Sequence, residues 1–219
     1  MLELIRKFRA LSPQKRARIT STVSMIYNFL SGGVKIFLGI MSSYFFACVS
    51  GAYVLCIGMG KRIYFHGREV SEGETIKEIK YYKRIGIIIF IGAVCYIIAV
   101  MRYIIFFEQL SRYGMLTSIV LCSVSFVEIT LAVMGIIRAR RDKDLLMEGL
   151  KCINFVTSLV AIVTTEAVLL TWLEIGNASY VNGVSGLVFG VLSASVGIFI
   201  FVKAVKLNRK FGVAKFRAG

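Results

Sequence analysis

The chain contains very little proline and histidine, and few acidic residues. Proline occurs once, at Pro13, and histidine once, at His66. Because proline breaks helix interiors, its near absence permits long uninterrupted helices. The five cysteines lie inside apolar runs and form no CxxC pair, so neither disulfides nor structural zinc is expected. No apolar run holds a histidine or an aspartate, and no spacing resembles a nucleophile with its base. We therefore expect no enzyme activity, no metal and no cofactor.

Long polar segments are also scarce. The chain is 57% hydrophobic with a mean hydropathy of +0.76, whereas soluble domains average roughly 45–50% apolar. Six apolar runs are each long enough to cross a bilayer, which takes about 20 residues. This pattern predicts an all-α fold, a polytopic bundle of six transmembrane helices. The predicted spans are about 19–41, 44–60, 85–107, 114–137, 145–173 and 183–205, between a basic arm 1–18 and a basic tail 206–219.

The charge is strongly asymmetric, with 27 basic and 12 acidic residues. The basic residues occur in short blocks between apolar runs, which argues against nucleic-acid binding. Counted by predicted loop, 24 of the 27 fall on one side of the membrane. The positive-inside rule then places both termini in the cytoplasm. Such an arm and tail would lie on anionic lipid headgroups.

Local signals place several helix ends. Pro13 after Ser12, and Asp144 before an apolar run, are both typical of helix starts. Ser71 and Glu74 fit the S-x-x-E capping box, so we expect a helix to begin near Ser71 within a polar loop over residues 61–84. His66 would be a surface residue of that loop. Asn177 fits a glycosylation pattern, but its predicted loop is short.

Four charged residues lie deep within the apolar runs, far from their cytoplasmic ends. At about 1.5 Å per residue, Lys35, Arg102 and Glu166 share a depth of roughly 25 Å from the cytoplasmic end, and Glu128 lies at roughly 14 Å. The shared depth predicts a cluster in which Lys35 or Arg102 pairs with Glu166. The alternative is that these three side chains extend to the outer interface. The Glu128 side chain is too short to reach the interface from its depth, although its carboxylate could be protonated in place.

Glu128 is the leading functional candidate, because an acidic residue near the midplane is typical of transporter sites. One hypothesis is a small transporter-like or exporter-like protein of the plasma membrane that couples to protons or cations through Glu128. The alternative is a non-transporting scaffold or regulatory subunit that packs against a second copy or another membrane protein. Small residues spaced by four favour close helix packing, within one bundle or between subunits: Gly186, Gly190 and Ala194; Gly114, Ser118 and Cys122; Thr157, Ala161 and Thr165.

The first two spans carry a resemblance. Lys35-x-x-x-Gly39, followed by Ser42-Ser43 and a second span, resembles the first hairpin of cation diffusion facilitators, six-span exporters of zinc-like metals with cytoplasmic termini. That family has His or Asp pairs four residues apart on its second and fifth spans, which this chain lacks, so metal export is not implied. The whole chain is similar to uncharacterised six-span membrane proteins of Gram-positive bacteria, which implies a bacterial plasma membrane.

Overall fold

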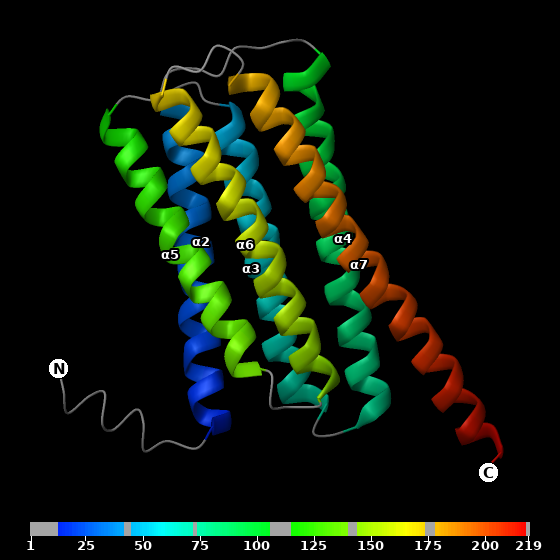
Figure 1. The fold of residues 1–219 in the computed structure, drawn as a ribbon. Helices are drawn as coiled ribbons and strands as arrows, with labels where there is room; N and C mark the ends of the chain where they lie inside the picture. The colour runs from blue at the N-terminus through cyan, green and yellow to red at the C-terminus, as the bar shows by residue number, and fades with distance from the viewer. Residues whose placement is uncertain are drawn as a thin grey trace, which may run out of the picture.

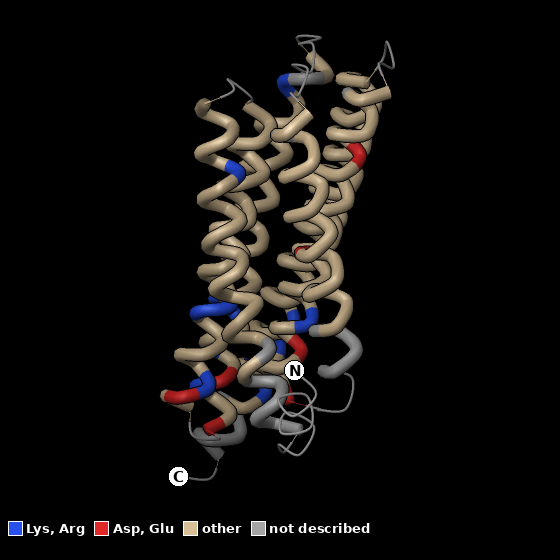
Figure 2. The backbone as a smooth tube through the Cα atoms, turned by 90° about the vertical axis from the view of Figure 1, so that its left-hand side faces the viewer, with Lys and Arg blue, Asp and Glu red and all other residues tan. Residues whose placement is uncertain are grey.

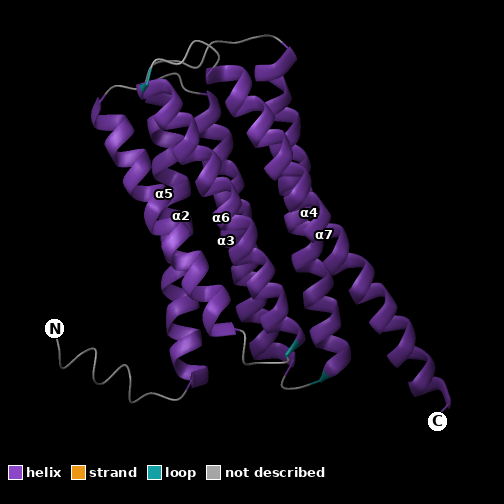
Figure 3. Cartoon of the chain, in the orientation of Figure 1, coloured by secondary structure: helices purple, strands orange, loops and turns teal. Residues whose placement is uncertain are grey.

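The computed structural model describes residues 13–41, 45–71, 74–105, 115–139, 144–173 and 178–217. These residues form six α-helices and, within the ranges just given, no strand (Figure 3). The all-α prediction is therefore confirmed. The helices are α2 (Pro13–Met41), α3 (Phe45–Ser71), α4 (Thr75–Ile105), α5 (Met115–Ala139), α6 (Leu145–Trp172) and α7 (Ala178–Arg217).

The helices form two rows of three. Helices α2, α3 and α4 make one row and α5, α6 and α7 the other, so that α2 packs on α5, α3 on α6 and α4 on α7. Successive helices run in opposite directions, and both chain ends lie at the same end of the bundle (Figure 1). We call this the basic end, because most of the lysine and arginine drawn on the tube gathers there (Figure 2).

The bundle is built to lie in a membrane. Helices α2, α3, α4, α6 and α7 are each long and apolar enough to cross a bilayer. The outward side chains include large exposed apolar residues such as Phe37, Leu116 and Phe126, the reverse of a water-soluble surface. Helix α5 lies alongside the other five (Figure 1), although its described apolar stretch, Ser118–Met134, is shorter. The chain is thus an integral membrane protein with several membrane-crossing helices.

The interior has an apolar half and a polar half. The main apolar core draws its buried residues from α3, α4, α6 and α7, and includes the tilted ring pair Tyr53–Tyr96, with centroids 5.4 Å apart. The buried side chains of α2 that face the other helices are mostly polar: Ser24, Asn28, Ser31 and Lys35. The inner face of α2 is therefore polar.

Glycines permit close backbone contacts on both sides of the bundle. A Cβ atom at Gly51 of α3 would lie 2.7 Å from the carbonyl oxygen of Gly32 on α2. On the other side, Cβ atoms at Gly186 and Gly190 of α7 would lie 2.8 Å and 2.6 Å from side-chain carbons of Val100 and Ile97 on α4. The predicted small-residue seam of the last span therefore packs within the bundle.

Two predicted helix starts are confirmed. Helix α2 begins at Pro13. Asp144 caps α6, since its extended backbone precedes the helix and its Oδ1 accepts from the backbone N–H of Leu146 at 3.0 Å. His66 is exposed, as expected, although it lies on a helix and its ring meets the edge of Tyr81. Asn177 and the arm before Pro13 lie outside the described residues.

The predicted polar loop is wrong over residues 61–71, whereas the helix predicted to begin near Ser71 corresponds to α4. Helix α3 continues through Lys61 to Ser71, and α4 begins at Thr75. Ser71 is the last residue of α3, and its hydroxyl donates back to the Gly67 carbonyl at 2.5 Å. Residues 61–71 stay helical because Lys61, Tyr64, Gly67 and Ser71, spaced by three or four, are all buried on one face. Similarly, α7 begins at Ala178, inside the predicted outer loop.

Candidate functional site

A polar face of α2 organises the candidate site. Ser24, Asn28, Ser31 and Lys35 follow one another at intervals of four, three and four residues, and all four are buried. Side chains at these intervals project from one side of a helix. This face points toward α3 and α5, the two helices that contact α2. The rest of the site is formed by the side chains that these two helices and α6 bring to it.

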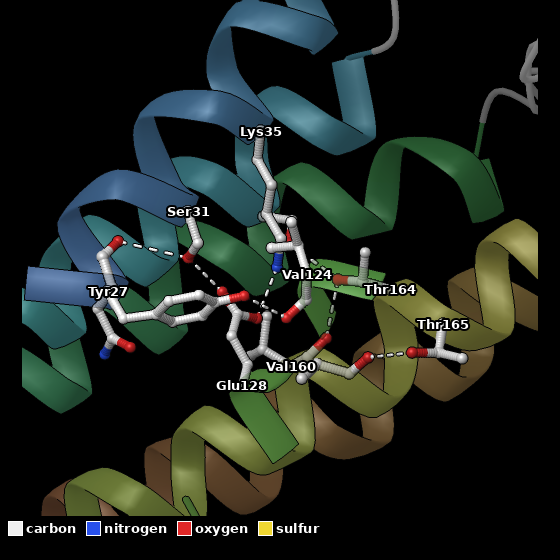
Figure 4. A network of polar contacts seen from close by, with 11 residues as sticks. Tyr27, Ser31, Lys35, Val124, Glu128, Val160, Thr164 and Thr165 are labelled. Atoms are coloured by element: carbon white, nitrogen blue, oxygen red, sulfur yellow. Dashed lines mark hydrogen bonds and ion pairs between the residues drawn. The ribbon is translucent and has the colours of Figure 1, made fainter. Parts of the chain in front are cut away.

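Lys35 and Glu128 form an ion pair inside this face. Lys35 Nζ lies 2.7 Å from Glu128 Oε2, and both side chains are 0% exposed. Ser31 Oγ donates to the other carboxylate oxygen, Oε1. Figure 4 shows the carboxylate of α5 between the lysine and the serine of α2. A charged pair in hydrocarbon is costly to bury and is usually retained for a function.

A second contact joins the same two helices one turn away. The Tyr27 hydroxyl donates to the carbonyl oxygen of Val124 at 2.9 Å (Figure 4). Val124 precedes Glu128 by one helical turn, so the tyrosine and the lysine hold neighbouring turns of α5 against α2. Ser31 and Lys35 hold the Glu128 carboxylate directly, and Tyr27 holds the neighbouring turn of the same helix.

The expected partner of Lys35 was wrong. Glu128, instead of Glu166, accepts the lysine. Glu166 accepts from Ser185 Oγ at 2.8 Å and so joins α6 to α7. The Arg102 guanidinium lies over the Phe45 ring, 5.1 Å from its centroid, and the residue is exposed. Exposure agrees with an interfacial Arg102, whereas the fully buried Lys35 does not reach the interface.

Side-chain direction explains the pairing of two residues that the depth estimate separated. A helical side chain leans toward the N-terminus of its own helix. Lys35 on α2 therefore leans toward the basic end, and Glu128 on the antiparallel α5 leans away from it, so their charged groups approach each other. Figure 1 also shows α2 extending past α5 at the basic end, so the two helices do not share one starting level.

Lys61 is a buried cation that the sequence reasoning missed. Its Nζ donates to Ser24 Oγ at 2.6 Å, and the residue is 1% exposed. The side-chain amide nitrogen of Asn28 donates to the Ser24 carbonyl oxygen. In this orientation the amide oxygen of Asn28 accepts from Lys61 Nζ at 3.1 Å. The sequence places Lys61 in a loop because it begins the polar stretch over residues 61–84. The signal was its spacing, four residues after the buried Ile57 and three before the buried Tyr64.

The polar contacts continue between α3 and α6. Ser50 Oγ and Thr164 Oγ1 lie 2.9 Å apart, and both are buried. The Thr164 hydroxyl donates to the Val160 carbonyl at 2.9 Å (Figure 4), so Ser50 is the donor to Thr164. The metal-exporter resemblance would require His or Asp pairs on these two helices, and this contact instead joins two neutral hydroxyls. Among the described residues, no three His, Cys, Asp or Glu side chains gather as a metal site.

The site therefore contains one buried carboxylate, two buried lysines and several neutral hydroxyl and amide groups, all inside the bundle. Both oxygens of the Glu128 carboxylate already accept, one from Lys35 and one from Ser31, so any other cation would have to compete with Lys35 for them. The chain matches no known protein family model and no curated protein.

Proposed function

We propose that this integral membrane protein is a small transporter in which the Lys35–Glu128 pair is the coupling site. The observation that carries the proposal is the complete burial of this pair between α2 and α5. Replacing a buried ion pair with apolar residues is often neutral or stabilising. Stability alone is therefore a weak reason to keep such a pair inside a membrane protein. Ionisable groups within membrane helices typically mark ion or proton pathways.

The mechanism follows from competition at the carboxylate. When Glu128 is ionised, Lys35 neutralises it and α2 is held against α5. A proton or metal cation that binds Glu128 removes the attraction for Lys35 and weakens the α2–α5 contact. Ser125 lies three residues from Glu128 on the same helix, and its buried hydroxyl has no hydrogen-bond partner among the described residues. That hydroxyl is a candidate second ligand for a cation arriving at Glu128.

The transport prediction concerns Glu128→Gln, which keeps the side-chain volume but removes the charge and the titration. The protein is reconstituted into vesicles loaded with a pH-sensitive dye. With wild-type protein, a gradient of sodium, potassium or zinc ions across the vesicle membrane should change the lumenal pH. Glu128→Gln should abolish this response, because the carboxylate can no longer exchange a proton for a cation.

Glu166→Gln is the matched control, since Glu166 also lies deep within an apolar run and contacts Ser185 instead of Lys35. It should retain the response. A wild-type protein that moves no protons with any of the three cations, or a Glu128→Gln variant as active as wild type, contradicts the transport proposal.

A scaffold or regulatory subunit is the second candidate. Its support is that Glu128 is packed among Lys35 and Ser31 and is only 1% exposed. On this proposal the ion pair fastens α2 to α5, and the exposed apolar faces would receive lipid, a second copy or another membrane protein. The scaffold would restore the phenotype of a deletion strain even when Glu128 is replaced by glutamine.

We further propose that both termini lie in the cytoplasm, in the plasma membrane of a bacterium. The support is the concentration of lysine and arginine at the basic end, which would face the cytoplasm and its anionic lipids (Figure 2).

The topology proposal predicts how single cysteines react in intact cells. On a background without the native cysteines, Tyr180→Cys should react with a membrane-impermeant maleimide, and His66→Cys should react only after lysis. Both positions are exposed and lie at opposite ends of the bundle. Labelling of position 66 in intact cells, with position 180 protected, would reverse the proposed orientation.

A further inference from the structure

A basic cavity lies between α4 and α7 at the basic end, away from the Lys35–Glu128 pair. Its volume is about 550 Å³. It is lined by four cationic side chains, one amide and three apolar residues: Lys77, Lys80, Lys83, Arg209, Asn208, Ile76, Ile79 and Val205. No acidic side chain belongs to this described lining. The cavity therefore combines positively charged side chains with apolar ones.

The cations of this cavity are held in different ways. Lys77 pairs with Glu74 at 3.0 Å, and both side chains are exposed. Lys83 lies over the Phe201 ring of α7, with Nζ 5.0 Å from the centroid. Lys80 and Arg209 are exposed. Four positive groups line the cavity, and Glu74, which pairs with one of them, lies outside its lining, so the cavity is complementary to an anion.

The cavity lies where the membrane surface is expected. On α4, the last charged residues before a long apolar stretch are Lys83 and Arg84, and on α7 the apolar stretch ends at Val202. A second, mainly apolar groove of about 480 Å³ follows α7 and is lined by Ser195, Ile198, Phe199, Val202, Lys203 and Lys206. The groove and the basic cavity share no lining residue, but Lys206 of the groove and Arg209 of the cavity lie three residues apart on α7.

We propose that the basic cavity binds the phosphate headgroup of an anionic phospholipid, whose acyl chain lies along the apolar groove of α7. A soluble anion would explain the charges but not the adjoining apolar groove or the level of the cavity at the end of the apolar stretches. A phospholipid explains all three features. The proposal does not depend on transport.

The test measures thermal unfolding of the purified full chain in neutral detergent while phosphatidylglycerol is titrated against phosphatidylcholine. Phosphatidylglycerol should raise the unfolding temperature of wild type, and phosphatidylcholine should not. Each lysine near a membrane surface contributes about 1 kcal/mol toward an anionic lipid. The double variant Lys80→Gln/Lys83→Gln should therefore need roughly 30-fold more phosphatidylglycerol for half of the effect.

The double variant Arg62→Gln/Lys151→Gln removes the same charge at the same end of the bundle but outside the cavity, and should respond as wild type does. Equal losses in the two double variants would overturn the proposal, because the attraction would then be diffuse. Stabilisation by inorganic phosphate at similar concentrations would also overturn it and identify a soluble-anion site.

Discussion

Replacing Lys35 with methionine should destabilise the protein far more than the same change at Lys61. Both lysines are buried, but only Lys35 has a carboxylate within ion-pair distance in the described structure, Glu128 at 2.7 Å. Removing one member of a buried pair leaves an uncompensated charge and typically costs about 3–5 kcal/mol. We expect a loss of that order for Lys35→Met, measured as the free energy of unfolding in mixed detergent micelles.

Lys61→Met is the matched control. It removes hydrogen bonds to two neutral acceptors, Ser24 and Asn28, each contributing roughly 1 kcal/mol. It also removes a buried ammonium, which offsets part of that loss. The net change should stay within about 1 kcal/mol. A Lys61→Met variant that loses as much as Lys35→Met would show that the carboxylate does not distinguish the two sites.

The second large effect is expected at Gly51. A methyl group there would meet the Gly32 carbonyl oxygen at 2.7 Å and the backbone nitrogen of Ile36 at 2.9 Å. These are backbone atoms, so α3 must move away from α2 to accommodate the added carbon. Overpacking of this kind costs about 1–3 kcal/mol. We expect Gly51→Ala to lower the unfolding free energy by this amount and to weaken the Lys61–Ser24 contact, which crosses the same interface.

Gly33→Ala tests whether the effect comes from packing. Gly33 is next to Gly32 in sequence, but a Cβ atom there would meet nothing within 4 Å. Because alanine is favoured over glycine in helices by about 1 kcal/mol, Gly33→Ala should be neutral or stabilising. A destabilising Gly33→Ala, or a harmless Gly51→Ala, would contradict the close packing of α2 and α3.

The fold was largely predictable, because membrane-crossing helices are identified by run length and proline content. The start of α2 at Pro13 and the Asp144 cap followed from residue type alone. The end of α3 did not follow from residue type, because the polar stretch that begins at Lys61 is typical of a loop. Lys61 and Ser71 are polar, yet they are buried against neighbouring helices, so tertiary packing extended the helix past the apolar run.

The candidate site was predictable in its members but not in its pairing. Lys35 and Glu128 were both recognised as charges within apolar runs. Depths counted along each helix axis placed them roughly 11 Å apart, as the difference between about 25 Å and about 14 Å. Such depths take no account of side-chain direction, although each side chain points toward the N-terminus of its own helix. They also assume that α2 and α5 reach the same level at the basic end, which they do not. Nor could they indicate that α5, and not α6, packs beside Lys35.

A double-mutant cycle at Lys35 and Glu128 tests the central claim most directly, since it measures whether the two charges act as one unit inside the bundle. The free energies of unfolding of Lys35→Met, Glu128→Gln and the double variant are compared with that of wild type. Each single change leaves one buried charge without its partner, whereas the double change leaves none at this pair. The double variant should therefore lose less than the sum of the single losses, with a coupling energy of about 2–3 kcal/mol. Losses that add to within roughly 0.5 kcal/mol would show that the two residues are energetically independent and would contradict the pairing.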